Sequence, residues 1–235
     1  MRTLIIVTGT DRQIMRFWLP SLRGKGDYNG DILILNYDMN ASSVEKLRKE
    51  ETVIIRKVTR CCACFESDRI IAAYEYLMDI RQNYDVIMFT DGDVEFHKPV
   101  APLFELAKEK FCYIEETMLC KKWFGWHLRG NFPNLSAAWK EIENVPVINT
   151  GVFIGPAGMM YKTLKFITEN LSIKSTRGTE MLLINAYLRY YKPFETQRVG
   201  YEWNHLKGMH YTDGHEIAIL HMVGSTHPIQ LPRPR

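Results

Sequence analysis

Residues 86–93 read Val-Ile-Met-Phe-Thr-Asp-Gly-Asp. The apolar run predicts a buried strand, and it ends in two carboxylates separated by one glycine. Because side chains at i and i+2 of an extended segment point the same way, we expect Asp91 and Asp93 to converge on one hard divalent cation. Gly92 leaves room for a backbone or a phosphate to approach. The stretch therefore predicts a metal site that can neutralise a diphosphate, at the sheet edge where open α/β proteins bind ligands.

Strands and helices are predicted to alternate along the rest of the chain. Apolar runs predict strands over 4–7, 32–35, 53–58, 111–115, 147–154 and 218–222. Helical spacing and capping residues predict helices over 13–22, 42–49, 68–81, 102–110, 159–170 and 179–190. We therefore expect an α/β fold with a mostly parallel central sheet flanked by helices, in a single domain over 1–235.

Composition and charge exclude several classes of protein. The chain has 235 residues, of which 46% are hydrophobic, and a net charge of +3 from 30 basic and 27 acidic residues. That excess is too small to argue for a nucleic-acid partner, and no long basic run is present. No apolar segment approaches the length of a transmembrane span. The start of the chain predicts a first strand rather than a signal peptide, because its short apolar run has no small-residue cleavage site.

The five cysteines are at positions 61, 62, 64, 112 and 120. An odd number, with three crowded into four residues, does not form a secreted disulfide framework. The Cys-Cys-x-Cys spacing also lacks the paired pattern of zinc sites. We expect free thiols that pack as small hydrophobes, and hence a reducing, cytoplasmic location.

The two carboxylates need a third ligand, because hard cations prefer six or more donors. His221 is the leading candidate, since it lies where the last predicted strand gives way to a turn at Gly224. An imidazole beside carboxylates suits Mn²⁺ better than Mg²⁺, which stays the alternative. Taken alone, His221 is better interpreted as a histidine packed at a strand end than as a ligand.

Five motifs follow one another in the chain: Val7-Thr8-Gly9-Thr10-Asp11, Asp68-Arg69-Ile70, Tyr84-Asp85 before the apolar strand that ends in Asp91-Gly92-Asp93-Val94, Asn149-Thr150-Gly151-Val152-Phe153, and His221-x-x-Gly224-x-x-His227-Pro228. In this order they resemble the GT-A nucleotide-sugar transferases of glycosyltransferase family 8, which includes glycogenin and bacterial lipopolysaccharide galactosyltransferases. The resemblance extends through most of the chain. It implies a GT-A, Rossmann-like domain with a nucleotide-binding half over 1–100 and an acceptor-side half with the C-terminal metal-ligand segment over 101–235.

The resemblance also implies an activity. It predicts a metal-dependent glycosyltransferase that uses a nucleoside-diphosphate sugar, UDP-linked in this family, and a hydroxyl acceptor on a glycan, glycolipid or glycoprotein. Asp91, Asp93 and His221 would hold the metal. The implied nucleotide- and sugar-binding residues are Thr8, Gly9, Thr10, Asp11, Arg69, Asp91, Gly92, Asn149, Gly224 and His227, and the implied catalytic residues are Asp93, Arg69 and Glu180.

Two positions depart from the family pattern. His227 stands where the family usually has a phosphate-binding lysine, so its charge depends on pH. The start of the helix over 179–190 keeps its acid as Glu180 but has Met181 in place of a glutamine linked to retaining chemistry. Glu180 is therefore either a sugar-facing or catalytic acid, or a carboxylate that complements a helix dipole.

Structural readings compete with several of these roles. Arg69 could be a solvated residue or the partner of Asp68, and Thr8–Asp11 could be an ordinary capped turn. Asn149 could serve a turn. The aromatic and basic segment over 121–129 fits an acceptor-side wall, core packing or contact with a membrane surface.

Two other functions also stay open. A nucleotidyltransferase would share the acidic pair, but it would need a glycine-rich basic loop after the first strand, where residues 8–12 supply too little glycine. A non-catalytic nucleotide- or carbohydrate-binding module has no evident need for an open metal site.

Overall fold

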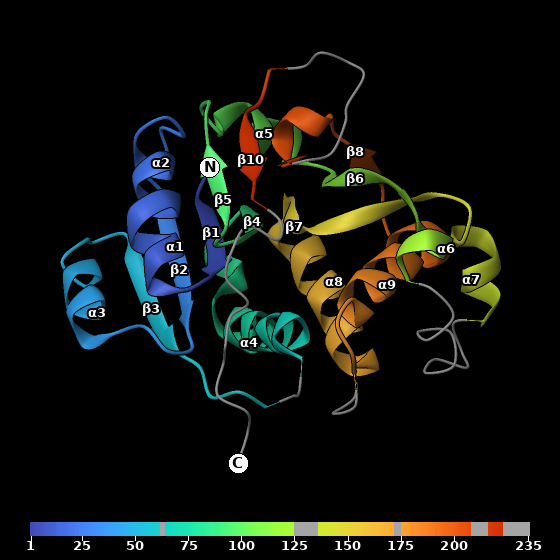
Figure 1. The fold of residues 1–235 in the computed structure, drawn as a ribbon, viewed down its shortest axis with the longest axis horizontal. Helices are drawn as coiled ribbons and strands as arrows, with labels where there is room; N and C mark the ends of the chain where they lie inside the picture. Colours follow the sequence, from blue (N-terminus) through green and yellow to red (C-terminus); the bar gives the residue numbers. More distant parts are fainter. Residues whose placement is uncertain (62–63, 125–135, 172–174, 208–215, 223–235) are drawn as a thin grey trace.

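A seven-stranded sheet in the order β3-β2-β1-β4-β7-β6-β8 forms the centre of the molecule (Figure 1). The structure is a computed structural model, and it describes residues 1–61, 64–124, 136–171, 175–207 and 216–222. The strands of this sheet are β1 (Thr3–Thr8), β2 (Asp31–Asn36), β3 (Val53–Lys57), β4 (Val86–Asp91), β6 (Phe111–Leu119), β7 (Pro146–Pro156) and β8 (Thr196–Arg198). A second, small sheet has the order β5-β10-β9, with β5 (Val94–Phe96), β9 (His205–Leu206) and β10 (Ile219–His221).

The first hundred residues form the parallel part of the large sheet, as the sequence predicts. β3, β2, β1 and β4 pair in parallel through the helical crossovers between them. These crossovers contain α1 (Asp11–Gln13), a π-helical turn (Ile14–Trp18), α2 (Leu19–Arg23), α3 (Ala41–Leu47) and α4 (Phe65–Ile80). β7 then runs antiparallel to β4 and β6, while β8 lies parallel to β6. The prediction of a mostly parallel sheet with flanking helices is confirmed.

The later helices are α5 (Ala101–Leu106), α6 (Cys120–Trp123), α7 (Ser136–Ile142), α8 (Ala157–Asn170) and α9 (Thr179–Ala186), and a π-helical turn over Tyr187–Tyr191 continues α9. Boundaries differ from the sequence prediction by a few residues. The N-cap of α3 is Asn40, whose side-chain oxygen accepts the N–H of Ser43 at 2.9 Å.

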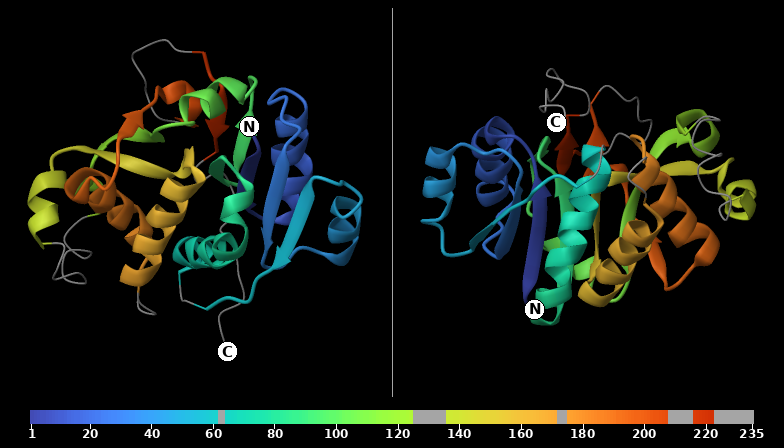
Figure 2. Two further views of the ribbon diagram at one scale, coloured as in Figure 1. Left: turned by 180° about the vertical axis from the view of Figure 1, so that it is seen from behind. Right: turned by 90° about the horizontal axis from the view of Figure 1, so that it is seen from below.

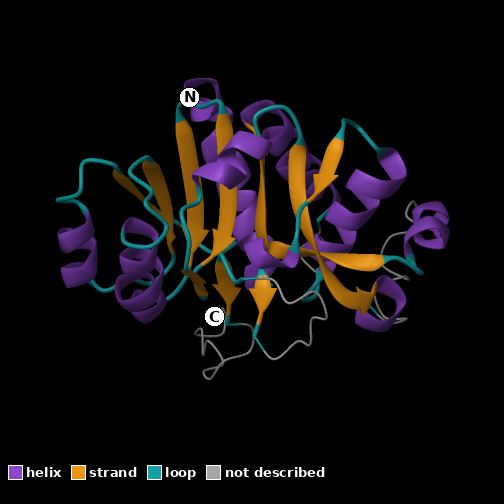
Figure 3. Cartoon of the chain, turned by 90° about the horizontal axis from the view of Figure 1, so that it is seen from above, coloured by secondary structure: helices purple, strands orange, loops and turns teal. Residues whose placement is uncertain are grey.

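Both faces of the large sheet are buried, which explains why its central strands are apolar throughout. In β1, Leu4 and Ile6 pack into one cluster and Ile5 and Val7 into the other. The first cluster includes buried residues of α4, α8 and α9, and the second includes Trp18 and residues of α2 and α5. Figures 2 and 3 show the strands side by side with helices packed against them, and both views of Figure 2 show α4 beside α8.

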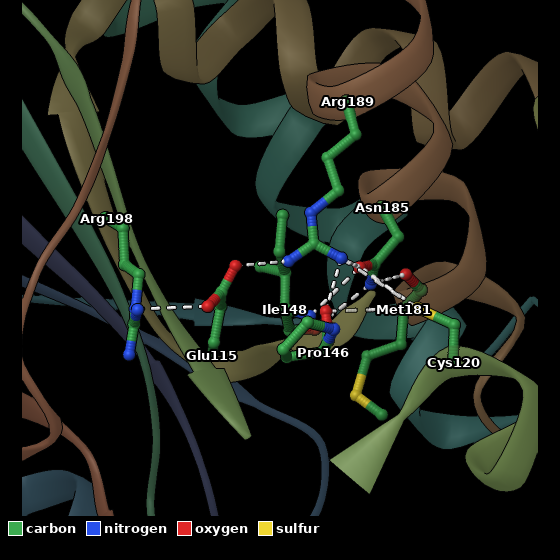
Figure 4. Close-up of polar contacts among 8 residues, drawn as sticks. All are labelled: Glu115, Cys120, Pro146, Ile148, Met181, Asn185, Arg189 and Arg198. Carbon is green, nitrogen blue, oxygen red and sulfur yellow. Dashed lines mark hydrogen bonds and ion pairs between the residues drawn. The ribbon is translucent and has the colours of Figure 1, made fainter. Parts of the chain in front are cut away.

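A polar cluster ties α9 and its continuation to the sheet (Figure 4). The guanidinium of Arg189 donates to Glu115 at 2.6 Å, and also to Asn185 and to the carbonyl of Pro146. The side chain of Asn185 in turn accepts the N–H of Ile148 at 2.9 Å and donates to the carbonyl of Met181 at 2.7 Å. These bonds satisfy buried polar groups and fix the helix that begins next to Glu180.

Among the residues that the structure describes, no helix is long and apolar enough to cross a membrane. Cys64, Cys112 and Cys120 are buried thiols, as predicted, whereas the Cys61 thiol is exposed. Burial raises the pKa of each of the three buried thiols to about 11, as expected for packed rather than reactive cysteines.

Candidate functional site

Asp91, Asp93 and His221 come together at the carboxyl end of β4. Each offers a ligand atom, and these atoms lie within 4.8 Å of one another. His221 Nε2 is 3.5 Å from Asp91 Oδ2 and 3.3 Å from Asp93 Oδ1. Two carboxylates and one imidazole are a donor set that suits Mn²⁺, or Mg²⁺ with water ligands, so these residues fit a divalent ion.

The local geometry of the two aspartates differs from the predicted one. Asp91 is the last residue of β4, but Gly92 and Asp93 form a turn before β5 begins at Val94. The chain at Asp93 is therefore not an extended i+2 position, and the expectation that a straight strand aligns the carboxylates is wrong. The turn, rather than the pleat, brings both carboxylates to the same side as His221.

The small sheet places His221 next to the two aspartates, although it is far from them in the sequence. β10 pairs antiparallel with β5, so that His221 lies opposite Val94. The N–H of Met222 donates to the carbonyl of Asp93 at 2.9 Å, and the N–H of Lys207 donates to the carbonyl of His221 at 2.8 Å. Backbone hydrogen bonds on both sides hold the histidine against the aspartate turn.

Asp93 is held in its charged form. Burial alone would raise its pKa, but the hydrogen bond and charge of His221 and the charge of Arg69 together lower it. Its side chain is only 27% exposed. A charged, half-buried carboxylate beside an imidazole attracts a cation strongly.

Gly92 and Gly9 allow the aspartate turn to cross the end of β1. A Cβ on Gly92 would lie 2.7 Å from Gly9 Cα and 2.8 Å from the carbonyl oxygen of Thr8. The N–H of Gly92 donates to that same carbonyl at 2.8 Å. The glycine between the aspartates was predicted to admit a backbone or a phosphate, and in this structure the neighbouring backbone is that of Gly9.

The turn after β1 has structural roles of its own. Thr10 caps α1, with reciprocal hydrogen bonds to Gln13, and Asp11 accepts hydrogen bonds from the backbone and side chain of Asn40. Thr10 and Asp11 therefore have the structural roles expected of an ordinary capped turn. Thr8 is different, because it is buried and its hydroxyl has no partner among the described residues.

Arg69 is buried and pairs with Asp91, one of the candidate metal ligands. Its guanidinium forms an ion pair with Asp91 and lies over the ring of Phe89, 5.3 Å from the ring centroid. Asp68, the alternative partner, accepts the N–H of Cys61 at 2.7 Å. Arg69 is thus neither solvated nor paired with Asp68, and its charge is directed to the carboxyl end of β4.

Glu180 is the second residue of α9 and is 2% exposed. Its Oε2 has no hydrogen-bond partner among the described residues. Burial raises the pKa of Glu180 to about 7, although the charge of Arg69 opposes the rise. A buried carboxyl that titrates near neutral pH close to an arginine is more than a first-turn carboxylate facing solvent, and it marks a candidate catalytic group.

Asn149 lies on β7 and its side chain makes three hydrogen bonds. Its Nδ2 donates to Glu116 at 2.7 Å, while its Oδ1 accepts the N–H of Gly151 at 2.7 Å and Nδ2 of Asn204 at 2.9 Å. Burial raises the pKa of Glu116, although hydrogen bonds from Asn149 and Trp123 oppose the rise. Sequence reasoning missed Glu116 and Asn204. Glu116 directly follows the strand predicted over 111–115, which was its only sequence signal, and nothing near position 204 marks that asparagine.

Three predicted features lie wholly or partly outside the described residues, namely Gly224, His227 and most of the aromatic and basic segment over 121–129. Of that segment, Trp123 donates its Nε1–H to Glu116 at 2.9 Å and packs on Phe124, which is buried. Core packing accounts for these two aromatic residues.

No family model and no curated protein sequence matches the chain. Solved structures do match it. A structure of an active-site mutant of LgtC superposes with a TM-score of 0.58 at 10% identity, over 94% of this chain and 87% of that one. The chain has the GT-A fold of glycosyltransferases. The galactosyltransferase LgtC in complex with donor and acceptor sugar analogues gives 0.55 at 12% identity with the same coverage. The bifunctional glycosyltransferase WbbM in its apo form gives 0.56 at 13% identity, over 95% of this chain and 46% of that one.

Proposed function

We propose that this protein is a metal-dependent glycosyltransferase. It would move a sugar from a nucleoside-diphosphate sugar, UDP-linked as in the resembling family, to a hydroxyl of a glycan, glycolipid or glycoprotein. One observation carries the proposal: Asp91, Asp93 and His221 offer metal ligands within 4.8 Å of one another at a strand's carboxyl end, on a fold that glycosyltransferases use.

Asp91, Asp93 and His221 would hold Mn²⁺, with Mg²⁺ as the alternative. When bound, the ion supplies positive charge against the donor diphosphate and orients it. Arg69 adds a fixed positive charge at the same edge, because its guanidinium is already directed to Asp91. His227 and the backbone N–H of Gly224 are proposed as further donors to the departing diphosphate.

The turn over Thr8, Gly9, Thr10 and Asp11 is proposed to bind the nucleoside. Thr8 is the favoured contact, since its buried hydroxyl has no partner among the described residues. Asn149 is proposed to lie near the sugar hydroxyls. Residues 1–100 would then form the nucleotide-binding half of one domain, and residues 101–235 the acceptor-side half.

Glu180 is proposed as the carboxyl group that acts on the reacting sugar. In an inverting reaction it would accept the proton of the acceptor hydroxyl, a role that its pKa near 7 suits. In a retaining reaction its carboxylate would stabilise the developing cationic sugar or form a transient covalent adduct. We favour retention on the family pattern, and the anomeric configuration of the product decides between the two.

The proposed location is the cytoplasm, at the membrane surface if the acceptor is a glycolipid. The experiment that tests the activity is incubation with Mn²⁺ and a panel of nucleotide sugars, followed by measurement of released nucleoside diphosphate. Mn²⁺-dependent release that Asp93→Ala abolishes is the expected result. Release of pyrophosphate from a nucleoside triphosphate and a sugar phosphate would instead identify a nucleotidyltransferase, and binding without turnover would identify a binding module.

A further inference from the structure

A chain of buried hydrogen bonds connects Glu116 on β6 to His221 on β10. Asn149 donates to Glu116 and accepts from Asn204, and Asn204 Oδ1 lies 3.0 Å from His221 Nδ1. All four side chains are buried, with Asn204 only 1% exposed. We call these four side chains the asparagine relay.

The backbone of Gly151 fixes the direction of every bond in the relay. Its N–H can only donate, so the Asn149 atom that it contacts must be the carbonyl oxygen. The amide nitrogen of Asn149 then faces the Glu116 carboxylate, which accepts. The Asn204 atom that contacts the Asn149 oxygen must in turn be the NH₂ group.

This order leaves the carbonyl oxygen of Asn204 facing His221 Nδ1. An oxygen there can only accept, so Nδ1 must carry its hydrogen and donate to it. The other ring nitrogen, Nε2, is the one that faces Asp91 and Asp93 at 3.5 and 3.3 Å. In the neutral imidazole, a hydrogen on Nδ1 leaves a lone pair on Nε2 for a metal.

Gly151 also sets the position of the ring. A Cβ at this residue would overlap Cε1 of His221 and lie 2.7 Å from its Nδ1. The imidazole therefore packs directly on the glycine backbone. Residue 151 fixes the ring by contact and directs the relay through its N–H.

We infer that Asn204, with Asn149 and Gly151 behind it, is a positioning residue that presents Nε2 of His221 to the metal. Asn204 contacts Nδ1 of the ring and would not itself be a ligand of the ion. The inference rests on the proposed metal site and goes beyond it, because it assigns to residues of β7 and the segment before β9 the control of one ligand's orientation and tautomer. Partners of this kind change metal affinity by about 10- to 100-fold when removed.

The test measures Mn²⁺ binding in the absence of nucleotide. The electron paramagnetic resonance signal of free Mn²⁺ reports the affinity, and spin-echo modulation from a coordinated imidazole nitrogen reports ligation by histidine. Wild type should show the nitrogen coupling, and His221→Ala should lose it. Asn204→Leu should bind Mn²⁺ about 10- to 100-fold more weakly and lose most of the coupling. Gly151→Ala should lose the coupling because its added methyl group would displace the His221 ring, and this variant is the test if Asn204→Leu does not fold.

Asn185→Leu is the matched control, since Asn185 is an equally buried asparagine whose amide bonds backbone groups of β7 and α9. It should lose stability and keep the nitrogen coupling. Wild-type affinity and coupling in both Asn204→Leu and Gly151→Ala would overturn the relay while leaving the metal site intact. Absence of Mn²⁺ binding or of nitrogen coupling in wild type would instead refute the proposed site from which the relay is argued.

Discussion

Glu180→Gln should change how the stability of this protein depends on pH. In the folded protein, burial raises the pKa of Glu180 from an ordinary 4.5 to about 7. Between these values the unfolded chain has released the proton while the folded chain still holds it. The unfolded state therefore binds fewer protons, and the free energy of unfolding falls as pH rises.

The magnitude follows from the two pKa values. Each pKa unit corresponds to about 1.4 kcal/mol, so Glu180 lowers stability by about 2 to 3 kcal/mol between pH 5 and pH 8. Glutamine has nearly the same shape and no charge to bury, so the variant should lack this loss. For a chain of this size, the difference corresponds to about 5 to 10 °C in Tm.

The assay is calorimetric unfolding of wild type and Glu180→Gln at pH 5, 6.5 and 8, with chelator and without nucleotide. The two proteins should have similar Tm values at pH 5, and the variant should be the more stable at pH 8. Glu169→Gln, on the exposed surface of α8, is the control and should follow wild type throughout. If Glu180→Gln also follows wild type at all three pH values, then Glu180 does not carry a buried proton near neutral pH, and the reasoning from its burial fails.

Four further outcomes are expected. Asp93→Ala should abolish the gain in UDP affinity that Mn²⁺ confers, and His221→Ala should reduce that gain less, because imidazole brings no negative charge. Calorimetric titration with UDP in Mn²⁺ and in chelator measures the gain, and equal affinity of wild type in both conditions would exclude a metal-assisted nucleotide site. Glu180→Gln should keep donor binding while turnover falls at least about a hundredfold, as for a group that acts in the transition state, and near-normal turnover would reduce Glu180 to a structural carboxylate. Arg69→Met should lower the free energy of unfolding by about 3 to 5 kcal/mol, because it leaves Asp91 without its buried partner, and denaturant unfolding without a measurable shift in midpoint would contradict that pairing. Gly92→Ala should cost about 1 to 3 kcal/mol, since its Cβ would meet the backbone of Gly9 and Thr8, and a variant as stable as wild type would show that this crossing is loose.

The sequence alone determined the layout of the molecule. Strands that are apolar on both faces, separated by segments of helical period, specify a buried parallel sheet because only such a sheet covers both faces with helices. The Asp-Gly-Asp sequence at the end of one such strand indicated the site, since a strand's carboxyl end is where this architecture places ligands. The spacing of apolar residues and the turn and capping residues between elements carry this information, so one sequence sufficed.

Only the tertiary structure decided how the site residues meet. Periodicity along a strand cannot show that the chain turns at Gly92, and it therefore assigned the two aspartates a straight geometry that they do not have. The partner of Arg69 was also beyond the sequence, because Asp68 is its neighbour in the chain but Asp91 is its neighbour in space.

The roles of Glu116 and Asn204 depend entirely on long-range packing. Asn204 is separated by 55 residues from Asn149, to which it donates, and by 17 from His221. Hydrogen bonds between such distant positions leave no periodic trace in the sequence, because each residue's own neighbours in the chain take no part in them. The sequence specified which side chains a metal would need, and the packing of β7 and β10 against the aspartate turn decided which nitrogen of His221 faces them.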